Sequence, residues 1–236
     1  MDPVYDYVAA SLWPWLRLGM RWGIEGDDNI PRQGPVLLVS NHVSYLDPLI
    51  AGFVALRKGR RARFLAKQEL FRPPLGLALR AMGQIPVARG TDTASDALAR
   101  AVDALEKGEC VVVFPEGTIS HETFEPMAFK TGVARLMQRT GVPAVPMAIW
   151  GPQRLLTKGR PPALRPGVEV QVHVGEPLHA DSGADVVATV DRVRAAVVRM
   201  LRSAQQAYAQ HPAPDEDGWW TPRFADELAA RRRRTV

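Results

Sequence analysis

Short apolar segments alternate along this chain with longer segments whose apolar residues recur at helical spacing, and this alternation limits the folds it can form. In the clearest example, a segment from about residue 91 to about residue 108 has its apolar residues on one helical face and precedes the most apolar strand, at 110–114. Strands that alternate with helices predict an α/β fold with a mixed, mainly parallel sheet flanked by helices. The expected strands lie near residue 22 and at 36–40, 64–66, 85–87, 110–114, 145–149 and 168–174.

Length and composition predict one hydrophobic core with appendages. The chain has 236 residues, of which 46% are hydrophobic, enough for one domain of ordinary size. We expect an amphipathic N-terminal helix within residues 1–20, a main domain at 21–209 and a C-terminal tail with a basic end at 210–236. Residues 168–174 alternate between apolar and polar side chains, which predicts a half-exposed strand at an edge of the sheet.

The cysteine and histidine content excludes several classes of site. Cys110 is the only cysteine, so the chain cannot form an internal disulfide or a cysteine-based zinc cluster. Because it precedes a run of valines, we expect a buried thiol rather than a nucleophile. The five histidines are scattered, and we predict that the chain binds no metal ion and no other cofactor. The sequence contains no run of 18 apolar residues and no signal peptide, so we expect a cytoplasmic protein that does not span a membrane.

The charge of the chain indicates an acidic partner, since the net charge is +5 and the pI is near 9.7. Basic residues gather at 57–63 and at 231–234, where solvated charge, nucleic acid and anionic lipid head groups are the alternatives. The N-terminal segment favours lipid, because Trp13 and Trp15 lie close to Arg17, as in helices that lie in a bilayer interface. Packing of this helix on the protein's own core is an equally good interpretation. The sequence contains no nucleic-acid-binding motif, and we predict no nucleic-acid partner.

The segment Asn-His-Val-Ser-Tyr-Leu-Asp at residues 41–47 carries the strongest chemical signal. It places His42 and Asp47 at an H-x4-D spacing where an apolar strand gives way to a helix. A neutral imidazole can take a proton from an alcohol near neutral pH, and a nearby carboxylate fixes its tautomer and stabilises the imidazolium that forms. The pair supplies a base and the carboxylate that orients it, but the motif contains no side chain that acts as a nucleophile. The attacking group must therefore come from a substrate, and an alcohol is the natural candidate.

A purely structural role also explains Asp47. It lies at or near a helix start, either as the N-cap before Pro48 or as the third helical residue of a capping box that Ser44 opens. Capping is compatible with orienting His42, because backbone N–H donors also favour the ionised carboxylate. An isolated histidine at a strand end is more often structural, so the catalytic assignment depends on the segments that follow.

Three later segments extend the chemical signal. Residues 83–89 end in Arg89 at the exit of a short strand, where a guanidinium can bind phosphate or carboxylate. Residues 114–120 run from a buried strand into Pro-Glu-Gly-Thr, a tight turn whose exposed N–H groups suit an anion or a polarised carbonyl. Residues 145–151 form another buried strand. Each segment alone has an ordinary structural explanation.

In this order and spacing, the four segments resemble the glycerolipid acyltransferase family, most closely its 1-acylglycerol-3-phosphate acyltransferases. The family pattern is N-H-x4-D, then G-x-I-x-x-x-R, F-P-E-G-T-x-S and a V-P-x-A strand, which residues 41–47, 83–89, 114–120 and 145–151 match in turn. The resemblance extends from about residue 20 to about residue 205. It implies an α/β fold at a membrane surface, with an amphipathic N-terminal helix.

The resemblance implies acyl transfer by general-base catalysis. His42, oriented by Asp47, would deprotonate a hydroxyl of a lysophospholipid acceptor, and the oxygen would attack the acyl thioester of coenzyme A or acyl-carrier protein directly. The absence of a G-x-S-x-G nucleophile elbow agrees with this route. The implied location is the cytoplasmic face of the cell membrane, with peripheral binding to its anionic surface. The implied substrate-binding residues are Lys67, Arg89, Glu116, Gly117 and Thr118.

One position departs from the family pattern. The family often has arginine directly after Glu-Gly-Thr, and this chain has Ile119. If that arginine binds phosphate, Lys67, Arg89 or Arg154 must replace it, or the acceptor differs. Two alternatives therefore stay open: an acyltransferase for another acceptor, such as a glycolipid or an ornithine-type lipid, and a non-catalytic membrane-binding protein of the same fold. The presence of both members of the H-x4-D pair argues against the non-catalytic alternative.

Overall fold

A seven-stranded sheet forms the centre of the molecule, in the order β1-β7-β6-β2-β5-β3-β4. The computed structural model describes residues 3–87, 91–120, 124–163, 165–180, 183–209 and 219–220, with the backbone alone at 91–94. Within these residues every neighbouring pair of strands is parallel except β6 and β7, which confirms the mixed, mainly parallel sheet. The strands are β1 (Met20–Glu25), β2 (Val36–Ser40), β3 (Ala62–Lys67), β4 (Ile85–Val87), β5 (Cys110–Val113), β6 (Ala144–Trp150) and β7 (Val168–Val174).

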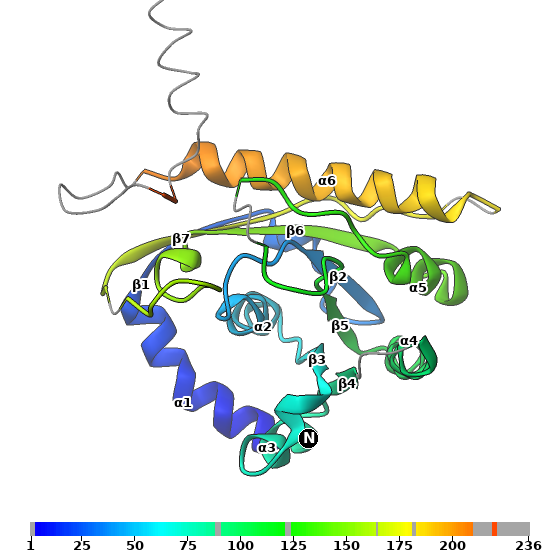
Figure 1. The fold of residues 1–236 in the computed structure, drawn as a ribbon, viewed down its shortest axis with the longest axis horizontal. Helices are drawn as coiled ribbons and strands as arrows, with labels where there is room; N and C mark the ends of the chain where they lie inside the picture. The colour runs from blue at the N-terminus through cyan, green and yellow to red at the C-terminus, as the bar shows by residue number, and fades with distance from the viewer. Residues whose placement is uncertain are drawn as a thin grey trace, which may run out of the picture.

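Helices cover both faces of this sheet (Figure 1). One face carries α1 and α2, the opposite face carries α4, α5 and α6, and α3 contacts α1. In the part of the chain that the structure describes, three short 3-10 helices, η1 to η3, lie in connecting segments. The bounds are α1 (Pro3–Gly19), η1 (Asp27–Asn29), α2 (Asp47–Arg57), η2 (Gln68–Phe71), α3 (Leu75–Ala81), α4 (Thr91–Glu106), α5 (Gly132–Thr140), η3 (Pro152–Arg154) and α6 (Val186–Ala207).

The side chains of the central strands explain why these segments are continuously apolar. On β2, Leu37 and Val39 pack toward α4, α5 and α6, while Val36 and Leu38 pack toward α2. A strand covered on both faces needs apolar residues at every position, and each fully buried aliphatic side chain contributes about 1.5–3 kcal/mol. The carboxyl end of β2 is thereby held rigidly in the centre of the sheet.

The structure corrects the prediction that β7 is a half-exposed edge strand. β7 lies between β1 and β6, and all seven of its residues are buried. Polar and apolar residues do alternate along β7, but α6 covers the polar face of the strand. On this face, His173 Nδ1 lies 3.0 Å from Ser203 Oγ. Polar partners on a helix can bury a polar strand face, and the sequence pattern does not distinguish this case from exposure to water. The edge strands are β1 and β4.

α1 has one face on the core and one face in solvent. The ring centroid of Trp13 lies 4.4 Å from that of Phe53, and the hydroxyl of Tyr5 accepts a hydrogen bond from the backbone of Ala62 at 3.0 Å. On the outer side, Trp15 and Leu18 are 80% and 82% exposed. Core packing, one of the two interpretations of this segment, is therefore correct for the inner face.

The basic segment at 57–63 is part of the fold's own hydrogen bonding. Arg60 is buried and donates to three backbone carbonyls, and Lys58 Nζ lies 2.5 Å from Asp28 Oδ1. Buried carbonyls need donors, and a guanidinium supplies several at once. These cations are therefore not a free surface for nucleic acid or lipid head groups. The basic end at 231–234 lies outside the described residues.

Candidate active site

The carboxyl ends of neighbouring parallel strands meet at one edge of the sheet, and the sequence motifs follow these ends. β2 lies between β5 and β6 and is parallel to both. Residues 41–47 follow β2, residues 114–120 follow β5, and η3 follows β6. In parallel α/β sheets this edge is the usual place for a ligand site. The strand order thus brings segments together that are more than 70 positions apart in the sequence.

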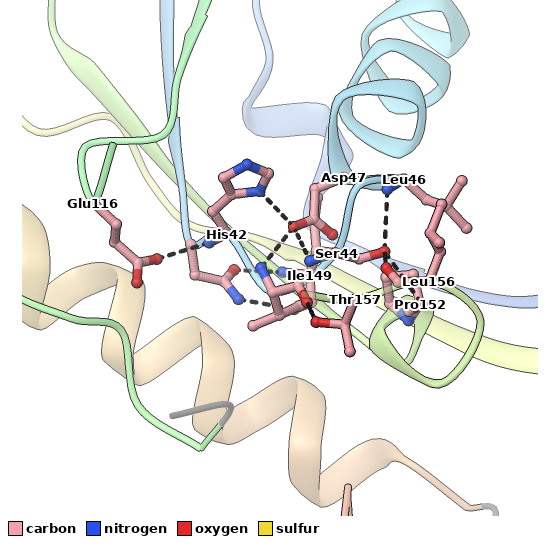
Figure 2. A network of polar contacts seen from close by, with 11 residues as sticks. His42, Ser44, Leu46, Asp47, Glu116, Ile149, Pro152, Leu156 and Thr157 are labelled. Atoms are coloured by element: carbon pink, nitrogen blue, oxygen red, sulfur yellow. Dashed lines mark hydrogen bonds and ion pairs between the residues drawn. The ribbon is translucent and has the colours of Figure 1, made fainter. Parts of the chain in front are cut away.

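His42 and Asp47 face each other across the loop between β2 and α2 (Figure 2). The distance between His42 Nδ1 and Asp47 Oδ2 is 2.9 Å. The imidazole is 17% exposed, and its other nitrogen, Nε2, lies on the far side of the ring from Asp47. When Nδ1 carries the hydrogen and donates it to Asp47, Nε2 is left as a proton acceptor. The geometry is that of a base held by its orienting carboxylate.

Asp47 does not cap α2 in either of the ways considered from the sequence. The residue at the N-cap position is Leu46, without a side-chain cap bond, and Asp47 is the first helical residue. Its Oδ2 instead points back along the chain and accepts the backbone N–H groups of Val43 and Ser44, each at 2.7 Å. These two bonds and the one from His42 converge on a single oxygen. The carboxylate therefore closes the loop onto the imidazole.

The environment of Asp47 has opposing effects on its charge. Complete burial raises the pKa of Asp47 above its ordinary value, and the hydrogen bonds from His42, Ser44 and Val43 oppose this rise. Oδ1 is also buried and has no hydrogen-bond partner within the described residues. Because three donors point at Oδ2, the site is built around a negative charge there.

Asn41 fixes the position of His42 from the preceding residue. Its side-chain amide donates to the carbonyl of Ile149 at 3.0 Å and accepts from the N–H of Ile149 at 2.8 Å. The amide thereby takes the place of a backbone peptide and continues the pairing of β2 with β6. This requires a side chain that both donates and accepts, which explains asparagine in the motif. The sequence alone did not reveal this role.

A second loop, at residues 155–157, stabilises the backbone that donates hydrogen bonds to Asp47. Ser44 Oγ donates to the carbonyl of Leu156 at 2.6 Å, and Thr157 Oγ1 donates to the carbonyl of Val43 at 2.7 Å. Both partners lie just after η3, which follows the carboxyl end of β6. The loop therefore keeps the N–H groups of residues 43 and 44 directed at Asp47.

Glu116 links the segment at residues 114–120 to the segment at residues 41–47. One carboxylate oxygen accepts the backbone N–H of His42 at 2.7 Å, and the other accepts that of Met127 at 2.9 Å. Burial raises the pKa of Glu116 to about 7, and the two N–H donors oppose this rise. This double acceptance explains why a glutamate stands at this turn. Its expected contact with substrate remains a prediction.

A cavity of about 760 Å³ opens beside this site. Four of the expected substrate-binding residues line it: Lys67, Glu116, Gly117 and Thr118. His42 is not itself a lining residue, but its ring stacks on the lining residue Phe114 with centroids 4.5 Å apart. The rest of the wall combines apolar residues of β3, β4 and β5 with one face each of α4 and α5.

The remaining site residues expected from the sequence lie elsewhere. Arg89 is outside the described residues. Arg154 lies away from the cavity lining, and its guanidinium stacks 3.8 Å from the ring of Trp220 and donates to Tyr208 at 3.1 Å. Ile119 is buried. Of the cations considered as a replacement for arginine at position 119, only Lys67 is thus described at the cavity.

Neither a metal-binding group nor a membrane-spanning helix is found among the described residues. Among them, no group of three or more His, Cys, Asp or Glu side chains lies close enough to bind a metal ion. None of the helices in this part of the chain has the length and apolar character needed to cross a membrane.

The chain is similar to known acyltransferases. The family model described as Acyltransferase matches residues 21–150. The chain is 32% identical to the chloroplastic 1-acyl-sn-glycerol-3-phosphate acyltransferase of Arabidopsis thaliana over 80% of this chain and 51% of that one. It is 28% identical to the 1-acyl-sn-glycerol-3-phosphate acyltransferase of Bacillus subtilis over 75% and 83% of the two chains.

A solved structure is also similar. The crystal structure of PlsC, the 1-acyl-sn-glycerophosphate acyltransferase of Thermotoga maritima, superimposes with a TM-score of 0.71 and 29% identity. The match covers 88% of this chain and 80% of that one. By contrast, the chain spans only about half the length of the plant relative.

Proposed function

This chain belongs to the acyltransferase family, and from this premise we propose that it transfers a fatty acyl group from a thioester to a hydroxyl of a lysophospholipid. The acceptor we propose is 1-acylglycerol-3-phosphate, which gives phosphatidic acid. The observation that carries the proposal is the contact between His42 and Asp47, 2.9 Å long, beside a cavity that can hold a lipid head group. The names of the plant and bacterial relatives support this choice of acceptor.

The proposed reaction needs one base and no covalent enzyme intermediate. His42 Nε2 takes the proton of the acceptor hydroxyl while Asp47 holds Nδ1–H. The oxygen attacks the carbonyl carbon of the thioester, the carbon–sulfur bond breaks, and the imidazolium returns the proton to the departing thiolate. Such base catalysis contributes about 10²–10⁴-fold, and the positioning of two substrates supplies much of the rest.

The single cysteine supports direct transfer rather than an acyl-enzyme. Cys110 is the first residue of β5 and is buried, and burial raises the pKa of its thiol to about 12. A thiol that is neither exposed nor ionised cannot carry the acyl group. The proposed donor is an acyl thioester of coenzyme A or acyl-carrier protein, and the protein needs no cofactor of its own.

The proposed acceptor site combines Lys67, Gly117 and Thr118 from the cavity wall with Arg89. A lysine ammonium is a compact charge suited to phosphate, and the Glu-Gly-Thr turn offers a hydroxyl next to it. Glu116 shapes this turn and holds His42 by its backbone. The cavity thus supports an acceptor with a small anionic head group.

We further propose peripheral attachment to an anionic membrane surface at the cytoplasmic face of the cell membrane. The outer face of α1 supports this, because Trp15 and Leu18 are exposed next to Arg17. α3 lies beside α1 (Figure 1) and exposes Leu75 and Leu77, so the apolar surface extends over both helices. Exposed tryptophan and leucine with flanking arginine is the composition of interfacial helices.

A thioester-consumption assay with a panel of acceptors tests the function. We expect turnover with 1-acylglycerol-3-phosphate and none after His42→Ala, with the fold retained because the imidazole is partly exposed. Turnover with a lyso-glycolipid or lyso-ornithine lipid instead would show that the acceptor is wrong but the chemistry right. Wild-type turnover in His42→Ala would reject His42 as the base. Vesicle binding without turnover on any acceptor would favour the non-catalytic alternative.

A further inference from the structure

Four cations line the cavity beside the Glu-Gly-Thr turn. Lys67 ends β3, Lys130 precedes α5, and Arg135 and Arg139 lie on α5 itself. Within the described residues, none of these four side chains forms a hydrogen bond or an ion pair. Among the described residues of the wall, Glu116 is the only acidic one, and its two oxygens are bonded to backbone N–H groups. The cavity therefore carries uncompensated positive charge and suits an anion.

Among these four cations, Lys130 is the one that lies against the turn itself. Gly117 has a positive φ of 71°, and a Cβ atom placed on it would lie 2.5 Å from Lys130 Nζ and 2.9 Å from Lys130 Cε. The ammonium group thus occupies the space directly over Gly117, which a side chain at this position would take. The backbone N–H of Lys130 donates to the carbonyl of Pro115 at 2.9 Å, which fixes the lysine to the same turn.

The turn under Lys130 is also the segment that holds the proposed base. Glu116, the neighbour of Gly117, accepts the backbone N–H of His42, and Phe114 stacks on the imidazole. In a glycerol phosphate, two carbon atoms and one ester oxygen separate the central hydroxyl from the phosphorus. The hydroxyl of an acceptor whose phosphate binds Lys130 is thus separated from the phosphorus by three atoms, and the same turn contacts the backbone and the ring of His42.

Other residues near the motif do not supply this charge. Ile119 is 4% exposed, so its apolar side chain belongs to the interior rather than to the cavity. Arg154 is engaged with Trp220 and Tyr208 away from the cavity lining. Arg135 and Arg139 follow Lys130 along α5, about one and two helical turns farther from Gly117.

We propose that Lys130 is the principal phosphate-binding cation of the acceptor site, with its ammonium over Gly117 and Lys67 as a second charge on the same cavity wall. This inference rests on the proposed acyl transfer to a phosphate-bearing acceptor and assigns a residue to it. A phosphate ester carries close to two negative charges at neutral pH, and two ammonium groups balance them. Lys130 thereby selects lysophosphatidate over acceptors without a phosphate monoester.

Three variants of the full chain test this assignment. Lys130→Gln removes the charge, Lys130→Arg keeps it, and Lys107→Gln removes a lysine at the end of α4, exposed and at the opposite edge of the sheet. Binding of a water-soluble short-chain lysophosphatidate is measured by titration calorimetry, and KM is measured for acceptor and donor separately. Loss of one charge-assisted hydrogen bond corresponds to about 10- to 100-fold in affinity.

We expect Lys130→Gln to weaken binding and raise the acceptor KM at least about tenfold, with the donor KM within about twofold. Lys130→Arg should recover most of the affinity, and Lys107→Gln should match the wild type. Equal affinity in Lys130→Gln and wild type overturns the assignment, as does a wild type that does not bind the ligand. Binding that depends on Lys130 without turnover on lysophosphatidate would instead reject the proposed function and keep the anion site.

Discussion

The backbone N–H of His42 donates to the carboxylate of Glu116 at 2.7 Å, and this bond joins two motifs that lie 74 positions apart in the sequence. Phe114 stacks on the imidazole from the same segment, with ring centroids 4.5 Å apart. The glutamate thus holds the backbone of the proposed base, while Asp47 holds its ring. Because Glu116 also accepts the N–H of Met127, it fixes the turn on which Gly117 lies.

Replacement of Glu116 by glutamine tests this double acceptance. The two carboxylate oxygens each accept an N–H, whereas an amide has only one oxygen and would direct its NH₂ group at the other N–H. We expect Glu116→Gln to lower the free energy of unfolding by about 1–3 kcal/mol at about pH 5 and to reduce kcat. Urea unfolding and steady-state kinetics measure the two effects. Glu125→Gln, at an exposed pair with Arg202, is the control and should cost under about 1 kcal/mol. Equal effects of the two variants would contradict the role of Glu116.

The raised pKa of Glu116 predicts how the stability of the folded protein changes with pH. Its value rises from an ordinary 4.5 to about 7 in the folded protein, so between these pH values the folded state binds the proton more tightly than the unfolded state. The contribution of Glu116 to stability is therefore fully present below about pH 4.5 and is lost as the pH rises to about 7.

Urea unfolding of wild type and Glu116→Gln at about pH 5 and about pH 8 measures this contribution. The stability advantage of the wild type should shrink by roughly 2–3 kcal/mol at the higher pH, because glutamine does not titrate. An advantage that grows with pH would show that the two N–H bonds outweigh burial and that the carboxylate is the favoured form.

Replacement of Asp47 by asparagine separates charge from shape. An amide oxygen can still accept the N–H groups of Val43 and Ser44, so we expect a folded protein. The imidazolium formed during the reaction loses its negative partner, and kcat should fall by about 10²–10⁴-fold. Steady-state kinetics at saturating substrates, with circular dichroism to check the fold, measures this. Asp103→Asn, exposed on α4, is the matched control. A kcat for Asp47→Asn equal to that of the control would remove Asp47 from the mechanism.

Removal of the exposed apolar side chains of α1 tests the membrane surface. The double variant Trp15→Ala with Leu18→Ala should weaken sedimentation with anionic phosphatidylglycerol vesicles by about tenfold or more, since each side chain can bury its apolar area in lipid. The same vesicle assay on Val187→Ala gives the control, because this exposed valine lies on α6, away from α1 (Figure 1). Unchanged sedimentation of the double variant would place membrane contact elsewhere or exclude it.

Replacement of Trp220 tests whether the C-terminal segment belongs to the folded unit. Trp220 is almost fully buried, and its ring lies 3.8 Å from the guanidinium of Arg154. Trp220→Ala should cost roughly 3 kcal/mol or more in the free energy of unfolding. Trp219→Ala, which removes a half-buried ring stacked on exposed Arg160, should cost about 1 kcal/mol. Chemical denaturation compares the two. A Trp220→Ala protein as stable as wild type would show that this segment is not part of the core.

The sequence predicted the strands and helices well where a pattern depends on neighbours along the chain. The apolar strand before His42, the helix after Asp47 and the mainly parallel sheet are all present. The prediction failed for β7, because its polar residues are buried by α6 rather than exposed. It also missed the internal bonding of Arg60, since the carbonyls that it binds belong to two distant segments, one at Pro31 and Gly34 and the other at Gly108. In both cases the partner is remote in the sequence.

The sequence by itself determined which chemical groups the chain offers and which of them follow a strand end, because strand and helix periodicity are local properties. The H-x4-D pair is close enough in sequence for its contact to be anticipated. Only the tertiary structure decided that Asn41 pairs with Ile149, that Glu116 holds His42, and that the Lys130 ammonium lies over Gly117. The physical reason is the strand order: β5 and β6 flank β2, and this adjacency depends on the packing of the whole sheet rather than on any one segment.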